Sequence, residues 1–211
     1  KFGTFAAKGA YAVAVVNNSF KPLTAQAWLY NVMDVADAYW LQADINCEKI
    51  KGLTIGAQYA NMDPKGLYAI RQDSTAYALK VGYAVDALKV SAAYSDADND
   101  GYLSIQNVAA SGQSKLYTEA WWNYTYVGAP GAESMNLTAE YDAGVAKLGA
   151  YYTSVENDIA ASTKNVDEVA VTASKSFGPL DATVAYVSTD ADDQNAGDRY
   201  DILQAYLTLN F

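Results

Sequence analysis

The sequence predicts an all-β chain, an antiparallel meander of about 11 amphipathic strands, from three observations. Apolar and polar residues alternate in short runs along all 211 residues, and this period of two gives a strand one apolar and one polar face. No run approaches the ~20 apolar residues of a membrane-spanning helix, although 51% of the residues are apolar. Short and long connections alternate between the later runs, as hairpins stacked in a meander would require.

The N-terminal half holds six alternating runs. In the second and third runs the aliphatic residues share one face, while Trp28 and Trp40 lie on the other face among amides and a carboxylate. The six expected strands cover residues 5–16, 23–32, 38–45, 53–60, 75–85 and 88–94.

The C-terminal half holds five further runs, over residues 135–141, 145–153, 168–176, 180–188 and 203–211. In the last run every odd position is apolar, and the run ends on Phe211. An apolar strand face that ends in a free carboxylate suits a strand that crosses lipid and stops at the interface. Outer-membrane β-barrels end in this way, so Phe211 is the predicted signal for the outer-membrane assembly machinery.

Tyrosine placement favours a membrane over water as the solvent of the apolar face. The chain has 18 Tyr, 4 Trp and 5 Phe. Tyr59, Tyr94, Tyr152 and Tyr186 each end an apolar stripe at the same end of a strand. A soluble sandwich also alternates but has no reason to repeat this register, whereas an aromatic belt at a membrane interface does. The fold class is therefore a transmembrane β-barrel in a bacterial outer membrane, which the chain crosses many times.

The connections orient this barrel. Short periplasmic turns and longer external loops are typical of such barrels, and the alternation here puts the C-terminus on the periplasmic side. Counting back 11 strands then puts the start of the chain outside, whereas a complete bacterial barrel has an even strand number. We therefore expect residues 1–211 to be a single barrel domain that belongs to a larger barrel, with an odd number of strands before Lys1.

Composition excludes several functions. The net charge is −10, from 24 acidic and 14 basic residues, which argues against nucleic acid as a partner. The absence of histidine removes the Ser-His and Cys-His catalytic arrangements on which barrel enzymes generally depend, so no enzyme is expected. A lone Cys47 excludes an internal disulfide.

Charged residues on the polar strand faces predict an aqueous interior. A Lys or Arg on the lipid face costs ~2–4 kcal/mol at the midplane, so these residues should face the lumen. The expected function is a general-diffusion porin that passes ions and small hydrophilic solutes with a mild cation preference. The alternative is that the charges pair across strands inside a plugged barrel, which would act as an adhesin or structural anchor. The predicted pore-lining residues are Lys8, Asp44, Lys80, Lys89, Glu140, Lys147 and Asp181.

One motif matches the start of a calcium-binding loop, with carboxylates at a spacing of two before a glycine. Position twelve of such a loop should be Glu but is Asn107, and no helices are expected on either side, so an EF-hand is rejected. A bare calcium turn and a simple acidic loop both remain open, and a second cluster at Asp190, Asp192 and Asp193 is weaker. The predicted calcium ligands are Asp96, Asp98, Asp100 and the carbonyl of Tyr102.

The longest connection, residues 95–133, contains an aromatic-rich stretch over 116–124. A loop of this length with its own apolar content is unlikely to extend freely into water. Three arrangements are open: an external lid, a loop folded into the lumen, or a contact with a neighbouring subunit.

Segments 22–28, 35–44 and 116–122 resemble the major outer membrane porins of Campylobacter and related epsilonproteobacteria, and the likeness runs through most of the chain to Phe211. The resemblance implies an 18-stranded, cation-selective homotrimer of roughly twice this length, surrounded by outer-membrane lipid and lipopolysaccharide. It also implies that the constriction loop lies in an N-terminal half outside this chain.

Overall fold

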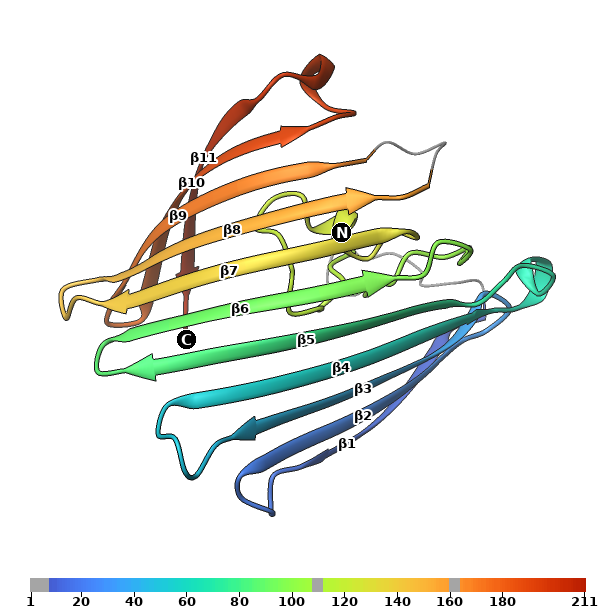
Figure 1. The fold of residues 1–211 in the computed structure, drawn as a ribbon, viewed down its shortest axis with the longest axis horizontal. Helices are drawn as coiled ribbons and strands as arrows, with labels where there is room; N and C mark the ends of the chain where they lie inside the picture. Colours follow the sequence, from blue (N-terminus) through green and yellow to red (C-terminus); the bar gives the residue numbers. More distant parts are fainter. Residues whose placement is uncertain (1–7, 108–111, 160–163) are drawn as a thin grey trace.

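The computed structural model describes residues 8–107, 112–159 and 164–211, and its main element is one sheet of 11 strands (Figure 1). The strands follow one another in sequence order, and each pairs antiparallel with the next. They are β1 (Ala10–Asn17), β2 (Leu23–Val32), β3 (Ala36–Asn46), β4 (Leu53–Pro64), β5 (Ser74–Val85), β6 (Leu88–Ala97), β7 (Ala132–Asp142), β8 (Lys147–Asn157), β9 (Val166–Phe177), β10 (Leu180–Ala191) and β11 (Tyr200–Leu209).

Three short helical turns complete the described secondary structure: η1 (Gly66–Tyr68), α1 (Tyr124–Val127) and η3 (Asn195–Gly197). Among the described residues, no helix is both long and apolar enough to cross a bilayer.

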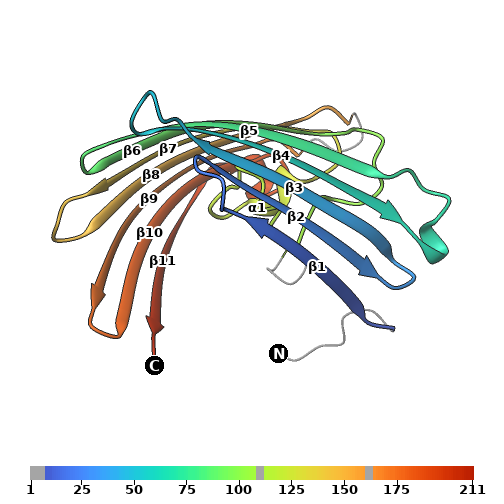
Figure 2. The same ribbon diagram turned by 90° about the horizontal axis from the view of Figure 1, so that it is seen from below.

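The sheet curves into an open arch rather than a closed barrel (Figure 2). Among the described strands, β1 pairs with β2 alone and β11 pairs with β10 alone, so the two edge strands each have one neighbour. The arch has a concave inner face and a convex outer face, and these two faces have opposite chemistry.

The outer face is apolar and exposed. Leu79, Leu137 and Val171 keep 55%, 45% and 50% of their surface exposed, which water would not favour over a whole sheet. The opposite residues on the inner face are small or polar and covered, as at Ala78 and Ser95, both 0% exposed. An exposed apolar face and a polar inner face are the arrangement of a transmembrane barrel wall.

The predicted aromatic belt is present on the outer face. Tyr39 and Tyr59 stack with ring centroids 5.8 Å apart, and Tyr77 and Tyr94 lie 6.3 Å apart on the next pair of strands. All four are exposed. The antiparallel register sets these rings at one depth, because neighbouring strands present their outward residues side by side.

All 11 predicted strands exist, but several are longer than predicted. β4 continues to Pro64, β6 continues to Ala97, and β7 begins at Ala132. The hydrogen-bonded ladder extends beyond the lipid-facing stripe, into small covered residues such as Ala97 and Ala132, which are 4% and 0% exposed. Three strand ends fall inside the predicted runs: β1 begins at Ala10 rather than residue 5, β8 begins at Lys147 rather than 145, and β11 ends at Leu209 rather than 211. Residues 5–7 lie outside the described part of the chain.

Candidate functional site

The connection between β6 and β7 folds back under the arch. Its described parts, residues 98–107 and 112–131, are called the lumen loop below; α1 belongs to it and lies on the concave side of the sheet (Figure 2). Of the three arrangements that the sequence left open for the aromatic stretch, the structure has the loop folded into the lumen. Three sets of contacts hold it there.

The first set joins the lumen loop to β3 and β4. The backbone N–H of Tyr117 donates to Oε1 of Gln58 at 2.9 Å, and Nε2 of Gln58 donates to the carbonyl of Lys115 at 3.2 Å. The Tyr117 hydroxyl donates to Oδ1 of Asp44 at 2.6 Å. Gly56 leaves the room for this bond, because a Cβ there would lie 2.5 Å from the hydroxyl oxygen. Tyr117 is thus held both at its backbone N–H and at its side-chain hydroxyl.

The second set joins the loop to β9 and β10 through a buried carboxylate. Glu168 is 2% exposed, and its two oxygens accept the backbone N–H groups of Trp122 and Asn123 at 2.8 and 2.9 Å. Nδ2 of Asn123 donates to Oγ1 of Thr189 at 2.8 Å. Charge-assisted bonds of this kind are stronger than neutral ones. Glu168 therefore ties the start of α1 to the wall.

The third set reaches β11 and the β8 wall through Trp121. Its indole Nε1 donates to Oε1 of Gln204 at 3.0 Å, and its ring lies 5.4 Å from that of Tyr151 and 6.4 Å from that of Tyr206. The lumen loop thus spans the inner face from β3 to β11 and narrows the space beneath the arch.

Apolar side chains of the loop fill the layer between it and the sheet. Ile105, Leu116 and Val127 are 4%, 2% and 0% exposed and pack in one cluster with small wall residues such as Ala60 and Ala78. Small residues on the wall let the loop approach closely. The loop is consequently a packed element of the structure.

The loop also carries ionisable groups with altered environments. Burial raises the pKa of Glu119, although bonds donated by the Ser114 hydroxyl and by the Ser114 and Lys115 backbone N–H groups oppose that shift. Burial, with a hydrogen bond to Asp193, raises the pKa of Tyr126 to about 12. The Nζ of Lys80 lies 4.2 Å from the centre of the Tyr117 ring, a cation–π contact in the lumen.

Most of the predicted pore-lining residues lie on the inner face. Asp44 and Lys80 touch the lumen loop. Lys89 and Glu140 are direct partners on β6 and β7, and Glu140 accepts a bond from Tyr151 at 3.1 Å.

The other predicted pore-lining residues lie near strand ends. Lys147 begins β8 opposite Asp142. Asp181, near the start of β10, accepts bonds from Ser176 and Asn210.

Lys8 is placed differently from the prediction. It precedes β1, and its Nζ lies 2.5 Å from Oδ2 of Asp34 in the β2–β3 turn, with both side chains about 60% exposed. The prediction that it lies on a strand face is wrong, because the strand begins two residues later. Phe211, the predicted assembly signal, follows β11 and is fully exposed; its role stays a prediction.

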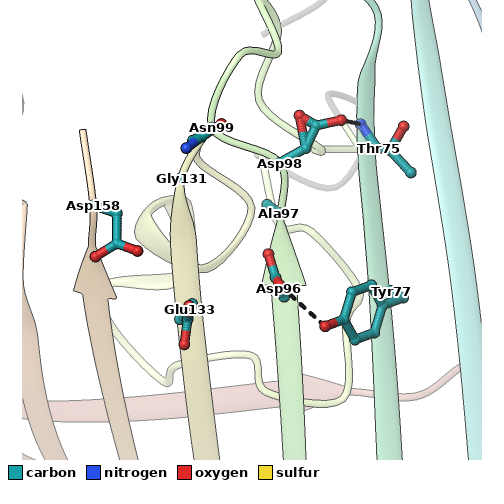
Figure 3. A pocket seen from close by; sticks show the side chains of 9 residues that line it. All are labelled: Thr75, Tyr77, Asp96, Ala97, Asp98, Asn99, Gly131, Glu133 and Asp158. Carbon is teal, nitrogen blue, oxygen red and sulfur yellow. Dashed lines mark hydrogen bonds between the residues drawn. The ribbon is translucent and has the colours of Figure 1, made fainter.

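Two of the predicted calcium ligands have partners within the protein. Asp96 belongs to β6 and accepts the Tyr77 hydroxyl at 3.0 Å on the outer face, while Asp98 accepts the Thr75 backbone N–H at 3.2 Å (Figure 3). The carboxyl groups of Asp98 and Asp100 are neighbours, and calcium binding by this turn stays a prediction. Tyr102 stacks on the Tyr68 ring at 5.6 Å. Among the described residues, no group of three or more ligating side chains could hold a metal ion.

These carboxylates lie beside a cleft of about 490 Å³ at the ends of β5 to β8, and Glu133 and Asp158, labelled in Figure 3, are also among its lining. Burial and the neighbouring carboxyl of Asp100 raise the pKa of Asp98. The acidic residues here point in different directions.

Sequence reasoning missed Glu168, the strongest anchor of the lumen loop. The sequence did indicate that Glu168 faces the lumen, because it lies on the same side of its strand as Ala170 and Thr172, opposite the apolar stripe, and a charged residue is costly on the lipid face. What the sequence does not give is its partner, because Trp122 lies 46 positions away.

No family model matches the chain, and no curated protein matches it in sequence. Solved structures do match. The crystal structure of Pseudomonas aeruginosa OccK10 (OpdN) has a TM-score of 0.76 at 15% identity over 95% of this chain and 60% of its own. OccK5 (OpdH) of the same species has a TM-score of 0.74 at 17% identity over 96% and 58%. The P. aeruginosa outer membrane protein OprD has a TM-score of 0.70 at 15% identity over 94% and 58%.

The fold is that of an outer-membrane β-barrel. The predicted fold class and the predicted outer-membrane location are thereby confirmed at the level of the fold. The chain spans about 60% of the length of these solved structures, and identities near 15% carry no more than the fold. The resemblance to the Campylobacter family stays a prediction. Its implication that the constriction loop lies outside this chain also stays a prediction, and the lumen loop is an inward-folded segment within this chain.

Proposed function

We propose that this chain forms the wall and the inward loop of an outer-membrane porin through which ions and small hydrophilic solutes diffuse. The observation that carries the proposal is the lumen loop, which is fixed at β3, β9 and β11 across a polar inner face. A loop held in this way reduces the width of a pore without being a removable lid. Nothing in such a structure requires a reacting group, in keeping with a channel rather than an enzyme.

A mild cation preference is part of this proposal. On the inner face Asp44, Glu140, Glu168 and Asp181 face Lys80, Lys89 and Lys147, and the whole chain carries −10. Rings of carboxylates favour cations in a water-filled pore. The named acidic residues outnumber the named lysines by only one on the inner face. Anions and cations would therefore both pass, with cations favoured.

The barrel that conducts must be closed, and the described sheet has two edge strands with one neighbour each. The proposal therefore includes further strands beside β1 and β11, as the predicted larger barrel would provide. The predicted homotrimer, and its contact with lipopolysaccharide, belong to the same proposal.

Planar-bilayer recording tests the channel. The purified full-length native protein should give stable conductance steps, and a KCl gradient should give a reversal potential of the sign that favours K⁺. A reversal potential that favours Cl⁻ would contradict the cation preference while leaving the channel in place.

The alternative is a plugged barrel that acts as an adhesin or anchor. One observation favours it: the loop packs Ile105, Leu116 and Val127 against the wall, which occludes part of the interior. The same recording separates the two functions, because a plugged barrel inserted in the bilayer gives no ion-conducting steps.

A further inference from the structure

A groove of about 1120 Å³ lies between the lumen loop and the inner faces of β1 to β4. We propose that it is a binding site for a neutral oligosaccharide along the path of the pore, an inference that rests on the proposed channel function. The argument comes from the residue types, their register and the scarcity of charge in this groove.

Tryptophan and tyrosine form one band of the groove. Trp28 and Trp40 are direct partners on β2 and β3, and both are half-buried with their side chains on the inner face. The Trp28 ring stacks on Tyr30 with centroids 6.1 Å apart and an angle of 8° between the planes. Flat aromatic faces in a lumen are suited to the C–H faces of sugar rings, because both surfaces are apolar while their edges are polar.

Three glutamines form a second band directly beside the first. Gln26, Gln42 and Gln58 are partners in register across β2, β3 and β4. The indole Nε1 of Trp28 donates to Oε1 of Gln26 at 2.9 Å, and Nε2 of Gln58 donates to Oε1 of Gln42 at 2.9 Å. These bonds fix the amides and the indole ring in one arrangement before any ligand arrives, which lowers the cost of binding.

Polar groups remain available for a ligand. Among the described residues, the Nε2 group of Gln26 and the hydroxyl of Tyr30 have no hydrogen-bond partner in the protein. Sugar hydroxyls can both donate and accept, so they suit an amide and a phenol equally. An aromatic face with adjacent amide groups is what a polyhydroxylated solute requires.

Charge distinguishes this ligand class from ions and amino acids. Of the described residues that line the groove, Lys115 alone is charged. A carboxylate or ammonium ligand would lose hydration here without gaining a matched partner. The volume of about 1120 Å³ lies just above the ~300–1,000 Å³ range of small-molecule sites, so several linked sugar rings fit rather than one.

Titration calorimetry with maltotriose, on the folded native protein in detergent micelles, tests the site. Saturable binding is expected, and Trp28→Ala should weaken it about tenfold, since aromatic anchors typically contribute more than ~1 kcal/mol and 1.4 kcal/mol corresponds to a factor of ten. Trp28→Phe should retain most of the affinity, because the aromatic face remains. Heat-modifiability on a gel identifies any variant that has not folded, and Gln26→Leu then serves as the second test, with weaker binding expected.

Phe177→Ala is the control, because Phe177 is an exposed aromatic side chain at the end of β9 that neither lines the groove nor contacts the described residues of the lumen loop. Its affinity for maltotriose should equal that of the unmodified protein. Absence of binding, unchanged binding in folded Trp28→Ala and Gln26→Leu variants, or tighter binding of the charged trisaccharide trigalacturonate would each overturn the proposal. A protein that conducts ions but binds no maltotriose refutes the sugar site alone. A protein that binds maltotriose but forms no conducting steps refutes the channel alone.

Discussion

Replacing Glu168 by alanine should release the lumen loop from the β9 wall. The side chain is 2% exposed and accepts the backbone N–H groups of Trp122 and Asn123 at 2.8 and 2.9 Å. Asn123 is 4% exposed, so its N–H would be left buried without a partner, whereas Trp122 is partly exposed and water can replace the lost acceptor. An unsatisfied buried donor costs about 1–3 kcal/mol, and the second lost bond adds about 1, which gives about 2–4 kcal/mol in favour of the released loop.

Hydrogen exchange measured by mass spectrometry is the direct assay. A change of about 2–4 kcal/mol corresponds to a roughly 30- to 1,000-fold greater population of the released loop, because 1.4 kcal/mol is a factor of ten. Peptides that cover residues 114–127 should exchange correspondingly faster in Glu168→Ala, while peptides from β4 to β6 should not change. Conductance steps should become larger or noisier, since the loop no longer occupies a fixed position in the pore.

Asp181→Ala is the matched control, because it also removes an inner-face carboxylate but contacts Ser176 and Asn210 rather than the loop. Exchange in 114–127 should stay at the level of the unmodified protein. If Glu168→Ala folds and its loop exchanges no faster than that of Asp181→Ala, then Glu168 does not anchor the loop and the reasoning is refuted.

Four further predictions concern the loop, the wall and the external cleft. Tyr117→Phe removes the hydroxyl bond at 2.6 Å and should speed hydrogen exchange around residue 117 about fivefold, for a loss of ~1 kcal/mol; unchanged exchange would contradict it. Burial raises the pKa of Glu119 in the folded state, so its contribution to stability is present at pH below its unfolded pKa and is lost as pH rises through its folded pKa. The difference in unfolding midpoint between Glu119→Gln and the unmodified protein should therefore grow as the pH rises above 4.5, the ordinary pKa of glutamate, and a constant difference would refute this. Leu79→Lys on the outer face should cost ~2–4 kcal/mol in urea titrations in lipid, whereas Thr138→Lys on the inner face should cost much less; equal losses would overturn the assignment of faces. Calorimetric titration with calcium should give no saturable heat, and a saturable heat that Asp98→Ala abolishes would restore the predicted site.

The strands were predictable because their information is local. The period of two in a run such as residues 180–188 decides which side chains share a face, whatever the partner strand is. The tyrosines at the ends of the apolar stripes predicted an aromatic belt. The structure places Tyr59, Tyr77 and Tyr94 on the outer face as expected. Strand ends were less predictable, since the ladder of β6 continues to Ala97 after the alternation of hydrophobicity has ended.

The candidate site was only partly predictable. The sequence put Asp44 and Lys80 on the inner face, but it gave no reason to choose Tyr117 as their shared partner. The calcium turn stays a prediction, but the structure shows partners that the spacing did not give. Pairing with β5 extends β6 to include Asp96, whose carboxylate accepts the Tyr77 hydroxyl.

By itself, the sequence determined the alternation, the aromatic residues, the negative charge and the absence of histidine, and hence the fold class of a membrane wall. Only the tertiary structure decided where the β6–β7 connection goes, because the bonds that anchor it join residues far apart in the chain, such as Asn123 with Glu168, 45 positions apart, and Trp121 with Gln204, 83 positions apart. The same holds for the groove, in which Trp28, Trp40 and three glutamines come into register only when β2, β3 and β4 pair. The local alternation of apolar and polar residues decides which face of a strand a side chain occupies. Its contacts across the lumen depend on the curvature of the whole sheet and on the path of the lumen loop, whose sequence has no repeating pattern.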